Sequence, residues 1–180
     1  MKNYKDELNY YTSVNKMMQK GGVVLFGSTF AKNISVAELC KAFDVDCNVY
    51  NRSFNDLSVF DAQELVSGAV MSLQPKKIIL QLGETDVERN EKSVEKLISS
   101  IKKADKKVKI IVASLSSDEN ECDKFNKALE SLAEKCRCQY VDISKAKTSD
   151  MPSVKAFSML RCFIPDQVSF FDAMNFANVG

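Results

Sequence analysis

Hydroxyl, amide and carboxyl side chains gather in four short segments of this chain of 180 residues. A hydroxyl group that lies beside a base and beside hydrogen-bond donors is the set that acyl-transfer chemistry requires. Taken singly, each segment has the composition of a turn or a helix cap, so the order of the four along the chain is more informative than any one of them. The segments are Gly27-Ser28-Thr29-Phe30, residues 51–56, Gly83-Glu84-Thr85-Asp86, and Asp172 to Asn175 with Gly180 after it.

The chain contains no histidine. In acyl-transfer sites built on serine, threonine or cysteine, an imidazole usually takes the proton from the nucleophile and returns it to the leaving group. That mechanism must therefore be replaced or absent here. A metal site built on histidine is excluded for the same reason.

We expect the six cysteines to be buried thiols, because most of them lie inside apolar-periodic segments. Cys136 and Cys138 resemble a metal or redox pair, but no second pair at metal-ligand spacing accompanies them. Residues 22–29 have the spacing of a phosphate-binding loop, with Ser28 in place of its lysine. However, the apolar strand between the two glycines cannot also present an exposed cradle of N–H groups. We therefore expect neither a metal nor another cofactor.

Near-continuous apolar runs, which are typical of parallel strands covered on both faces, alternate with helical patterns along the chain. The alternation predicts a three-layer α/β/α domain with a parallel sheet, whose ligands bind at the carboxyl ends of the strands. The predicted strands are residues 23–26, 45–50, 77–82, 108–113 and 138–143. The predicted helices are residues 4–19, 35–43 with a capping box at Ser35 and Glu38, a helix from Ser58, 94–101, 125–133, and a stretch from Ser153.

Length and composition indicate one globular domain over residues 1–180, with residues 1–20 as an N-terminal helical extension. The net charge is +1 and the basic residues form no stripe, so we expect no nucleic-acid partner. The N-terminus has no apolar segment typical of a signal peptide, and no run reaches transmembrane length. We therefore expect a cytoplasmic protein that does not span a membrane. Whether the chain is part of a longer parent protein stays open.

With the four polar segments in this order, the chain resembles the SGNH/GDSL hydrolase family from about residue 22 to residue 180. Intervening features such as VVLFGS, KIILQLGETD, Phe125-Asn126 and YVDI add to the resemblance. It implies a flavodoxin-like α/β/α fold with a five-stranded parallel sheet in the order 2-1-3-4-5. It also implies an ancestry among enzymes that hydrolyse esters of lipids, carbohydrates and other acyl donors.

The resemblance places altered residues at the catalytic positions. Thr29 stands at the position of the serine nucleophile, and Ser28 at that of the aspartate before it. Asp172 matches the family's aspartate, but Asn175 replaces its histidine. At the oxyanion hole, Thr85 replaces an asparagine, and a residue with a side chain replaces a glycine. The motif is short, so the residue that aligns with the family's glycine is either Asn55 or Asp56.

An asparagine is neutral over the useful pH range, so Asn175 cannot act as a general base. We therefore favour a catalytically impaired protein that binds a small acyl or carbohydrate-type ligand, or a protein partner, in the former cleft. The alternative is an active esterase or acyl hydrolase with a non-standard mechanism, in which Ser28 or Thr29 is the nucleophile and Asp172 the base. A third hypothesis is an assembly subunit that docks through its aromatic-rich C-terminal segment. Whether the protein is an enzyme stays open at this point.

Overall fold

The structure is a computed structural model that describes residues 4–86, 91–116 and 120–165 of the chain. The described residues form a five-stranded parallel sheet with the strand order β2-β1-β3-β4-β5, which confirms the predicted topology. The strands are β1 (Val23–Gly27), β2 (Val49–Asn51), β3 (Lys77–Gln81), β4 (Lys109–Ala113) and β5 (Gln139–Val141).

The second strand begins later than the sequence predicts. The Val45 N–H donates to the Cys40 carbonyl at 2.8 Å and so completes the end of a helix instead of entering the sheet. β1, in contrast, is buried at every position, as its apolar sequence requires. Since the residues between Gly22 and Gly27 are this strand, they do not form a phosphate-binding loop.

The helices lie close to the predicted segments, with one addition. A single turn of helix from Thr29 was not predicted, because four residues are too few to show a periodic pattern. The longer helices are α1 (Lys5–Asn15), α3 (Val36–Ala42), α4 (Val59–Ala69), α5 (Glu91–Ala104), α6 (Asn120–Lys135) and α7 (Pro152–Leu160). The short ones are α2 (Thr29–Lys32) and the 3₁₀ turns η1 (Met71–Leu73), η2 (Ser144–Thr148) and η3 (Arg161–Phe163).

Two serines were predicted to begin helices, and they behave differently. The Ser58 hydroxyl accepts a hydrogen bond from the Asp61 N–H at 3.0 Å and caps α4. Ser35 precedes α3, but its side chain makes no capping hydrogen bond, so the predicted capping box with Glu38 is wrong. The backbone of Ser35 has ψ 68° rather than the extended value typical of a capping residue, which explains the difference.

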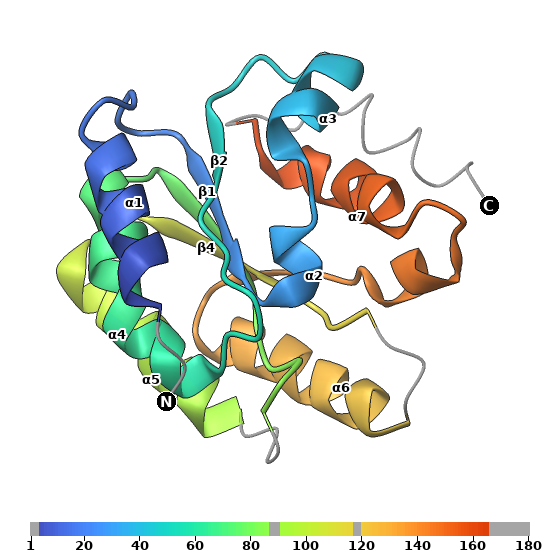
Figure 1. The fold of residues 1–180 in the computed structure, drawn as a ribbon. Helices are drawn as coiled ribbons and strands as arrows, with labels where there is room; N and C mark the ends of the chain where they lie inside the picture. The colour runs from blue at the N-terminus through green and yellow to red at the C-terminus, as the bar shows by residue number, and fades with distance from the viewer. Residues whose placement is uncertain (1–3, 87–90, 117–119, 166–180) are drawn as a thin grey trace.

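Helices cover both faces of the sheet, as Figure 1 shows. On one face, residues of α1, α4, α5 and α6 form a core cluster with Val24 and Phe26 of β1. On the other face, residues of α2, α3 and α7 form a second cluster with Val23 and Leu25. Successive side chains of a strand point to opposite faces, so β1 contributes to both clusters. The three-layer α/β/α fold is therefore confirmed.

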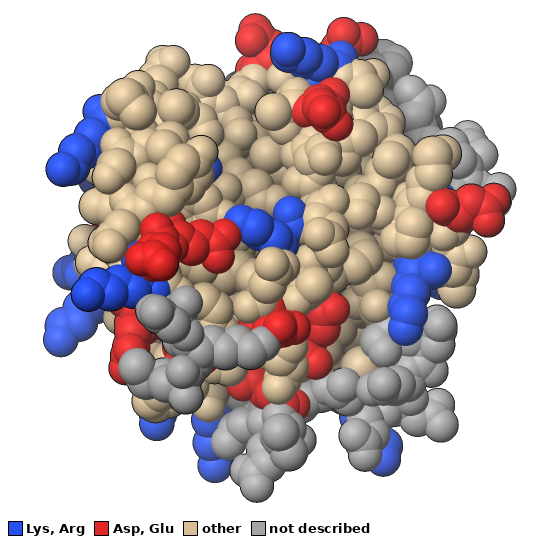
Figure 2. Space-filling view, viewed as in Figure 1, with Lys and Arg blue, Asp and Glu red and all other residues tan. Residues whose placement is uncertain are grey.

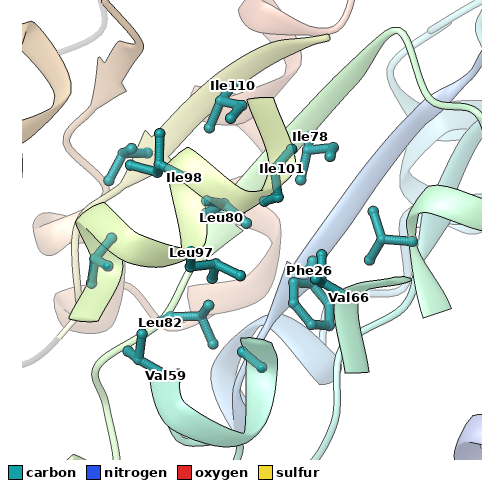
Figure 3. Packing of buried hydrophobic residues seen from close by; sticks show 14 of the residues in the cluster. Phe26, Val59, Val66, Ile78, Leu80, Leu82, Leu97, Ile98, Ile101 and Ile110 are labelled. Carbon is teal, nitrogen blue, oxygen red and sulfur yellow. The ribbon is translucent and has the colours of Figure 1, made fainter. Parts of the chain in front are cut away.

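Figure 3 shows how the first cluster packs over the middle of the sheet. Leu97, Ile98 and Ile101 of α5 lie over β3, and each is at most 1% exposed, as is Leu80 beneath them. Burying one side chain of this kind contributes about 1.5–3 kcal/mol relative to leaving it exposed. This packing fixes β3, whose carboxyl end leads into the candidate site.

None of the six cysteines is in a disulfide, but only Cys122 is buried. The prediction of buried thiols is therefore wrong for the other five, which lie near helix ends and loops and are partly exposed. Within residues 4–86, 91–116 and 120–165, no group of three or more cysteine, aspartate or glutamate residues could hold a metal ion. In the same ranges, no helix has the length and apolarity needed to cross a membrane.

Candidate functional site

Three of the four polar segments meet at the carboxyl edge of the sheet. β1 lies between β2 and β3 in the sheet, so the residues that follow these strands are neighbours in space. The first segment joins β1 to α2, the second runs from the end of β2 into the loop of residues 52–57, and the third is the turn of residues 83–86. This edge is where ligands bind in parallel α/β sheets.

Thr29 and Asp56 form a reciprocal pair of hydrogen bonds. The Asp56 N–H donates to the Thr29 Oγ1 at 2.8 Å, and the Thr29 hydroxyl donates to the Asp56 Oδ1 at 3.2 Å. Thr29 is partly exposed and Asp56 is exposed, so the pair lies at the surface of the protein. The hydroxyl at the predicted nucleophile position is thus already engaged with a carboxylate and a backbone N–H of the same chain.

Asp56 has a backbone conformation that favours glycine. Its φ is +53°, in the left-handed region, where a side chain is crowded by the backbone. The exposed Asn55 is not among the non-glycine residues with positive φ in the described ranges. Of the two residues, Asp56 is therefore the one whose backbone conformation suits a glycine, and the register of this motif stays a prediction.

The Thr85 hydroxyl is directed to the backbone of the neighbouring loop. It donates its single proton to the Leu57 carbonyl at 3.1 Å. A hydroxyl has one proton, so in this arrangement Thr85 cannot also donate to a developing oxyanion. Its observed contact ties the turn of residues 83–86 to the loop that carries Asp56.

Glu84 occupies a position that the sequence reasoning did not assign. Its carboxylate accepts a hydrogen bond from the Phe30 N–H at 3.1 Å, next to Thr29 in the first turn of α2. In the sequence, the only indication of a role for Glu84 was its place in a polar segment after a predicted strand. The consequence is that a second backbone N–H beside Thr29 is already bonded to a carboxylate.

Asp86 binds the start of α4. The Val59 N–H donates to both carboxylate oxygens of Asp86, each 3.2 Å from the Val59 nitrogen. Burial raises the pKa of the Asp86 carboxyl above its usual range, the Val59 N–H lowers it in part, and the charge of Asp61 raises it further. Asp86 therefore serves as a link between two segments of the site.

Ser28 lies below the surface, next to Thr29. It is fully buried, and within the described residues its hydroxyl has no hydrogen-bond partner. Its N–H donates to the Gln81 carbonyl at 3.1 Å and so continues the pairing of β1 with β3. A substrate acyl group cannot reach a fully buried hydroxyl without local opening, so Thr29 is the better placed of the two hydroxyls.

The fourth polar segment, with Asp172 and Asn175, lies outside the described residues. Convergence of these two side chains on Thr29 therefore stays a prediction.

Three carboxylates lie at this edge of the sheet. Asp56, Glu84 and Asp86 all come from the segments that meet there. Figure 2 shows acidic side chains gathered in the lower part of the view, below α2 of Figure 1. A surface with this charge repels anionic ligands and presents acceptors to groups that donate hydrogen bonds.

No protein-family model and no curated protein matches this sequence. Solved structures do match. A GDSL-like lipase from Bacteroides thetaiotaomicron is 16% identical, with 94% of this chain and 98% of that chain covered and a TM-score of 0.68. The chain has the SGNH/GDSL hydrolase fold. A candidate acylhydrolase from Bacteroides fragilis gives a TM-score of 0.69 at 14% identity, over 98% of this chain and 99% of that chain.

A further match with this fold is a catalytic mutant of an acetylxylan esterase from Geobacillus stearothermophilus. It is 14% identical, with a TM-score of 0.60 over 85% of this chain and 96% of that chain. At such identities the likeness establishes the fold. It does not transfer an activity, so the site residues of this SGNH-fold protein must be judged on their own geometry.

Proposed function

We propose that this SGNH-fold protein is catalytically impaired and binds a small acyl or carbohydrate-type ligand in the cleft where its structural relatives hydrolyse esters. The observation that carries the proposal is the reciprocal bonding of Thr29 and Asp56, at 2.8 and 3.2 Å, in a chain without histidine. The hydroxyl at the nucleophile position has no imidazole to activate it.

The expected loss of ester hydrolysis is large even if only part of the machinery is missing. Removing one oxyanion donor typically lowers turnover by ~10²–10³. Removing the nucleophile or its base in a serine hydrolase lowers it by ~10⁶, and these losses do not simply add. Here the Thr85 proton goes to Leu57, the Phe30 N–H is bonded to Glu84, and the chain has no histidine, so donors and base are affected together.

The charge of the cleft suggests which ligands would bind. The carboxylates of Asp56 and Glu84 are exposed and can accept hydrogen bonds from hydroxyl groups. An anionic ligand such as a sugar phosphate would be repelled by them. A neutral, hydroxyl-rich ligand such as a carbohydrate or its acetyl ester is therefore favoured over a free acid.

The test combines turnover with binding. We expect p-nitrophenyl acetate and butyrate to be hydrolysed at the buffer rate near neutral pH by the unmodified chain and by Thr29→Ala. Thr148→Ala is the matched control, since Thr148 is an exposed threonine on η2, far along the chain from the cleft residues. We also expect an acetylated xylo-oligosaccharide to shift the NMR signals of the Phe30, Asp56 and Glu84 amides without release of acetate. Turnover that Thr29→Ala abolishes and Thr148→Ala preserves would overturn the proposal.

The hydrogen bond from the Thr29 hydroxyl to the Asp56 Oδ1 also supports a second candidate function. In an active hydrolase, Thr29 Oγ1 would attack the acyl carbonyl while its proton passes to the Asp56 carboxylate. The departing alcohol would take that proton, and water would release the acyl group from Thr29. This route uses Asp56 as the base, whereas the route expected from the sequence uses Asp172. Loss of activity in Asp56→Asn or in Asp172→Asn distinguishes them.

Restoring the missing serine and histidine tests whether residues 29 and 175 align with the family's catalytic positions. The double change Thr29→Ser with Asn175→His should recover more hydrolysis than either change alone, because nucleophile and base act as a unit. Asp172 would then orient the new imidazole, as the aspartate of a catalytic triad does. If the double variant is no more active than either single variant, Asn175 does not stand at the position of the family's histidine.

A further inference from the structure

We propose that helix α1, together with Tyr4 directly before it, is a positioning element of the candidate site: the Tyr4, Glu7 and Tyr11 side chains hold the two segments that carry Thr29 and Asp56. The sequence predicted this region only as an N-terminal helical extension. The proposal concerns the geometry of the pair and holds whether or not the pair is catalytic.

The residues involved share one face of the helix. Tyr4, Glu7, Tyr11 and Asn15 follow each other at intervals of three, four and four residues. At 3.6 residues per turn, this spacing lines them up along one side of α1. Asn15 fixes the far end of that face, since its amide donates to the Ala69 carbonyl of α4 at 2.9 Å.

Two tyrosines of this face bind the loop of residues 52–57. The Tyr11 hydroxyl donates to the Ser53 carbonyl at 2.9 Å, and the Tyr4 hydroxyl donates to the Asp56 carbonyl at 2.9 Å. Between these contacts the fully buried Phe54 packs edge-on against both rings, with centroids 5.5 Å from Tyr4 and 5.2 Å from Tyr11. The loop is thus held on both sides of Phe54.

The start of the same loop is held by a buried cation. The Arg52 Nε donates to the Asn15 Oδ1 at 2.8 Å, and its guanidinium lies 5.1 Å from the centroid of the Tyr11 ring. Burial lowers the pKa of Arg52, while the nearby tyrosines act in the opposite direction. The contact therefore places a desolvated cation against α1, where an aromatic face compensates part of its lost hydration.

The same face also binds α2. The Lys32 ammonium, at the end of α2, donates to the Glu7 carboxylate and to the Tyr11 hydroxyl, and it lies 5.0 Å from the centroid of the Tyr11 ring. Burial alone would lower the pKa of Lys32, but the hydrogen bonds to Glu7 and Tyr11 raise it above its usual value. Since α2 is a single turn from Thr29 to Lys32, this contact fixes the orientation of Thr29.

Asp56 is therefore held from two directions. Its carbonyl accepts from Tyr4, directly before α1, and its N–H donates to Thr29 of α2. Its left-handed backbone, with φ +53°, is the less favourable conformation for a residue with a side chain and needs such support. Releasing the carbonyl should allow the N–H to leave Thr29 more often.

The experiment is amide hydrogen exchange by NMR on the full chain. Tyr4→Phe removes one hydroxyl and keeps the ring that packs on Phe54. A net hydrogen bond of ordinary strength corresponds to roughly fivefold in a local opening equilibrium, so the Asp56 amide should exchange roughly fivefold faster. The Phe30 amide should change in the same direction in Tyr11→Phe, which weakens the contact with Lys32.

Two controls separate positioning from general stability. Tyr10→Phe alters an exposed tyrosine of the same helix, and Tyr140→Phe removes a hydroxyl that donates to the Asn126 carbonyl at 3.2 Å, outside this network. Neither should change exchange at Asp56. The three-bond couplings of the Thr29 methyl carbon give a second readout, because Tyr4→Phe should broaden the distribution of Thr29 rotamers.

The proposal is wrong if exchange at Asp56 and the Thr29 couplings are unchanged in Tyr4→Phe. It is also wrong if all amides of the sheet accelerate equally in Tyr4→Phe, since α1 would then contribute only to global stability. If Tyr11→Phe does not fold, Tyr4→Phe alone decides. Tyr4 lies before the first turn of α1 and is only partly buried, so we expect this variant to fold.

Discussion

Replacing Asp56 by glycine and by alanine tests the strained backbone at the centre of the cleft. Both substitutions remove the carboxylate that accepts from Thr29, so the lost hydrogen bond cancels in the comparison. The remaining difference is the backbone at φ +53°. An alanine in the left-handed region lowers the free energy of unfolding by ~1–2 kcal/mol. A glycine there causes no such strain, but its freer unfolded chain lowers the free energy of unfolding by ~0.5–1 kcal/mol.

We therefore expect Asp56→Gly to be more stable than Asp56→Ala by about 1 kcal/mol. In a chain of this length that difference corresponds to about 2–4 °C in melting temperature. Urea unfolding followed by circular dichroism gives the free energy directly, and thermal melts give the independent check.

The matched control is the neighbouring position. Asn55 is exposed and lies outside the positive-φ set, so Asn55→Ala should be as stable as Asn55→Gly or more stable. The opposite pattern, with glycine preferred at residue 55 and not at residue 56, would refute the reasoning about the left-handed backbone at Asp56.

Further expectations concern the groups that support the cleft and the sheet. Burial, with help from nearby carboxylates, raises the pKa of Tyr140 to about 12, so absorbance titration should show one late-ionising tyrosine. The stability that this neutral phenol contributes is present below pH 10 and is lost as the pH rises toward 12, and Tyr140→Phe should remove that dependence. Gly83 has φ +108°, and an added Cβ would lie 2.4 Å from Phe125, so Gly83→Ala should destabilise the fold by about 1–3 kcal/mol in urea unfolding. Because the pKa of Asp86 is raised by burial, its ionised form is disfavoured in the folded state, so Asp86→Asn should be more stable than the unmodified chain at pH 7. That advantage should vanish as the pH falls below the ordinary carboxyl value of 3.8, which urea unfolding at several pH values would check.

The fold could be predicted from the sequence because its central strands are continuous apolar runs. β1 and β3 are buried at every position, and buried parallel strands need no polar alternation. β2 was placed too early because Val45 is apolar but belongs to the end of α3. α2 escaped notice since a single turn leaves no period to detect.

The candidate site could be located but not resolved from the sequence. Polar residues after β1, β2 and β3 indicated that these three segments lie together at one edge of the sheet, as they do. The hydrogen-bond partners of Thr29, Thr85 and Glu84 depend on how the three segments fold against each other, which residue types alone do not specify. Tyr4 and Tyr11 have helical spacing in the sequence, which predicts that they share one side of a helix. The same spacing is equally typical of tyrosines in a core, so it does not predict their hydrogen bonds to residues 53 and 56.

Single-turnover hydrolysis of p-nitrophenyl acetate, with mass spectrometry of the protein, tests the central claim most directly. If the cleft is catalytically impaired, the unmodified chain releases p-nitrophenol at the buffer rate and gains no acetyl group on Thr29. The Thr29→Ala variant should then release p-nitrophenol at the same rate. A burst of p-nitrophenol together with an acetyl adduct on Thr29, both absent in Thr29→Ala, would contradict the account and establish an active hydrolase.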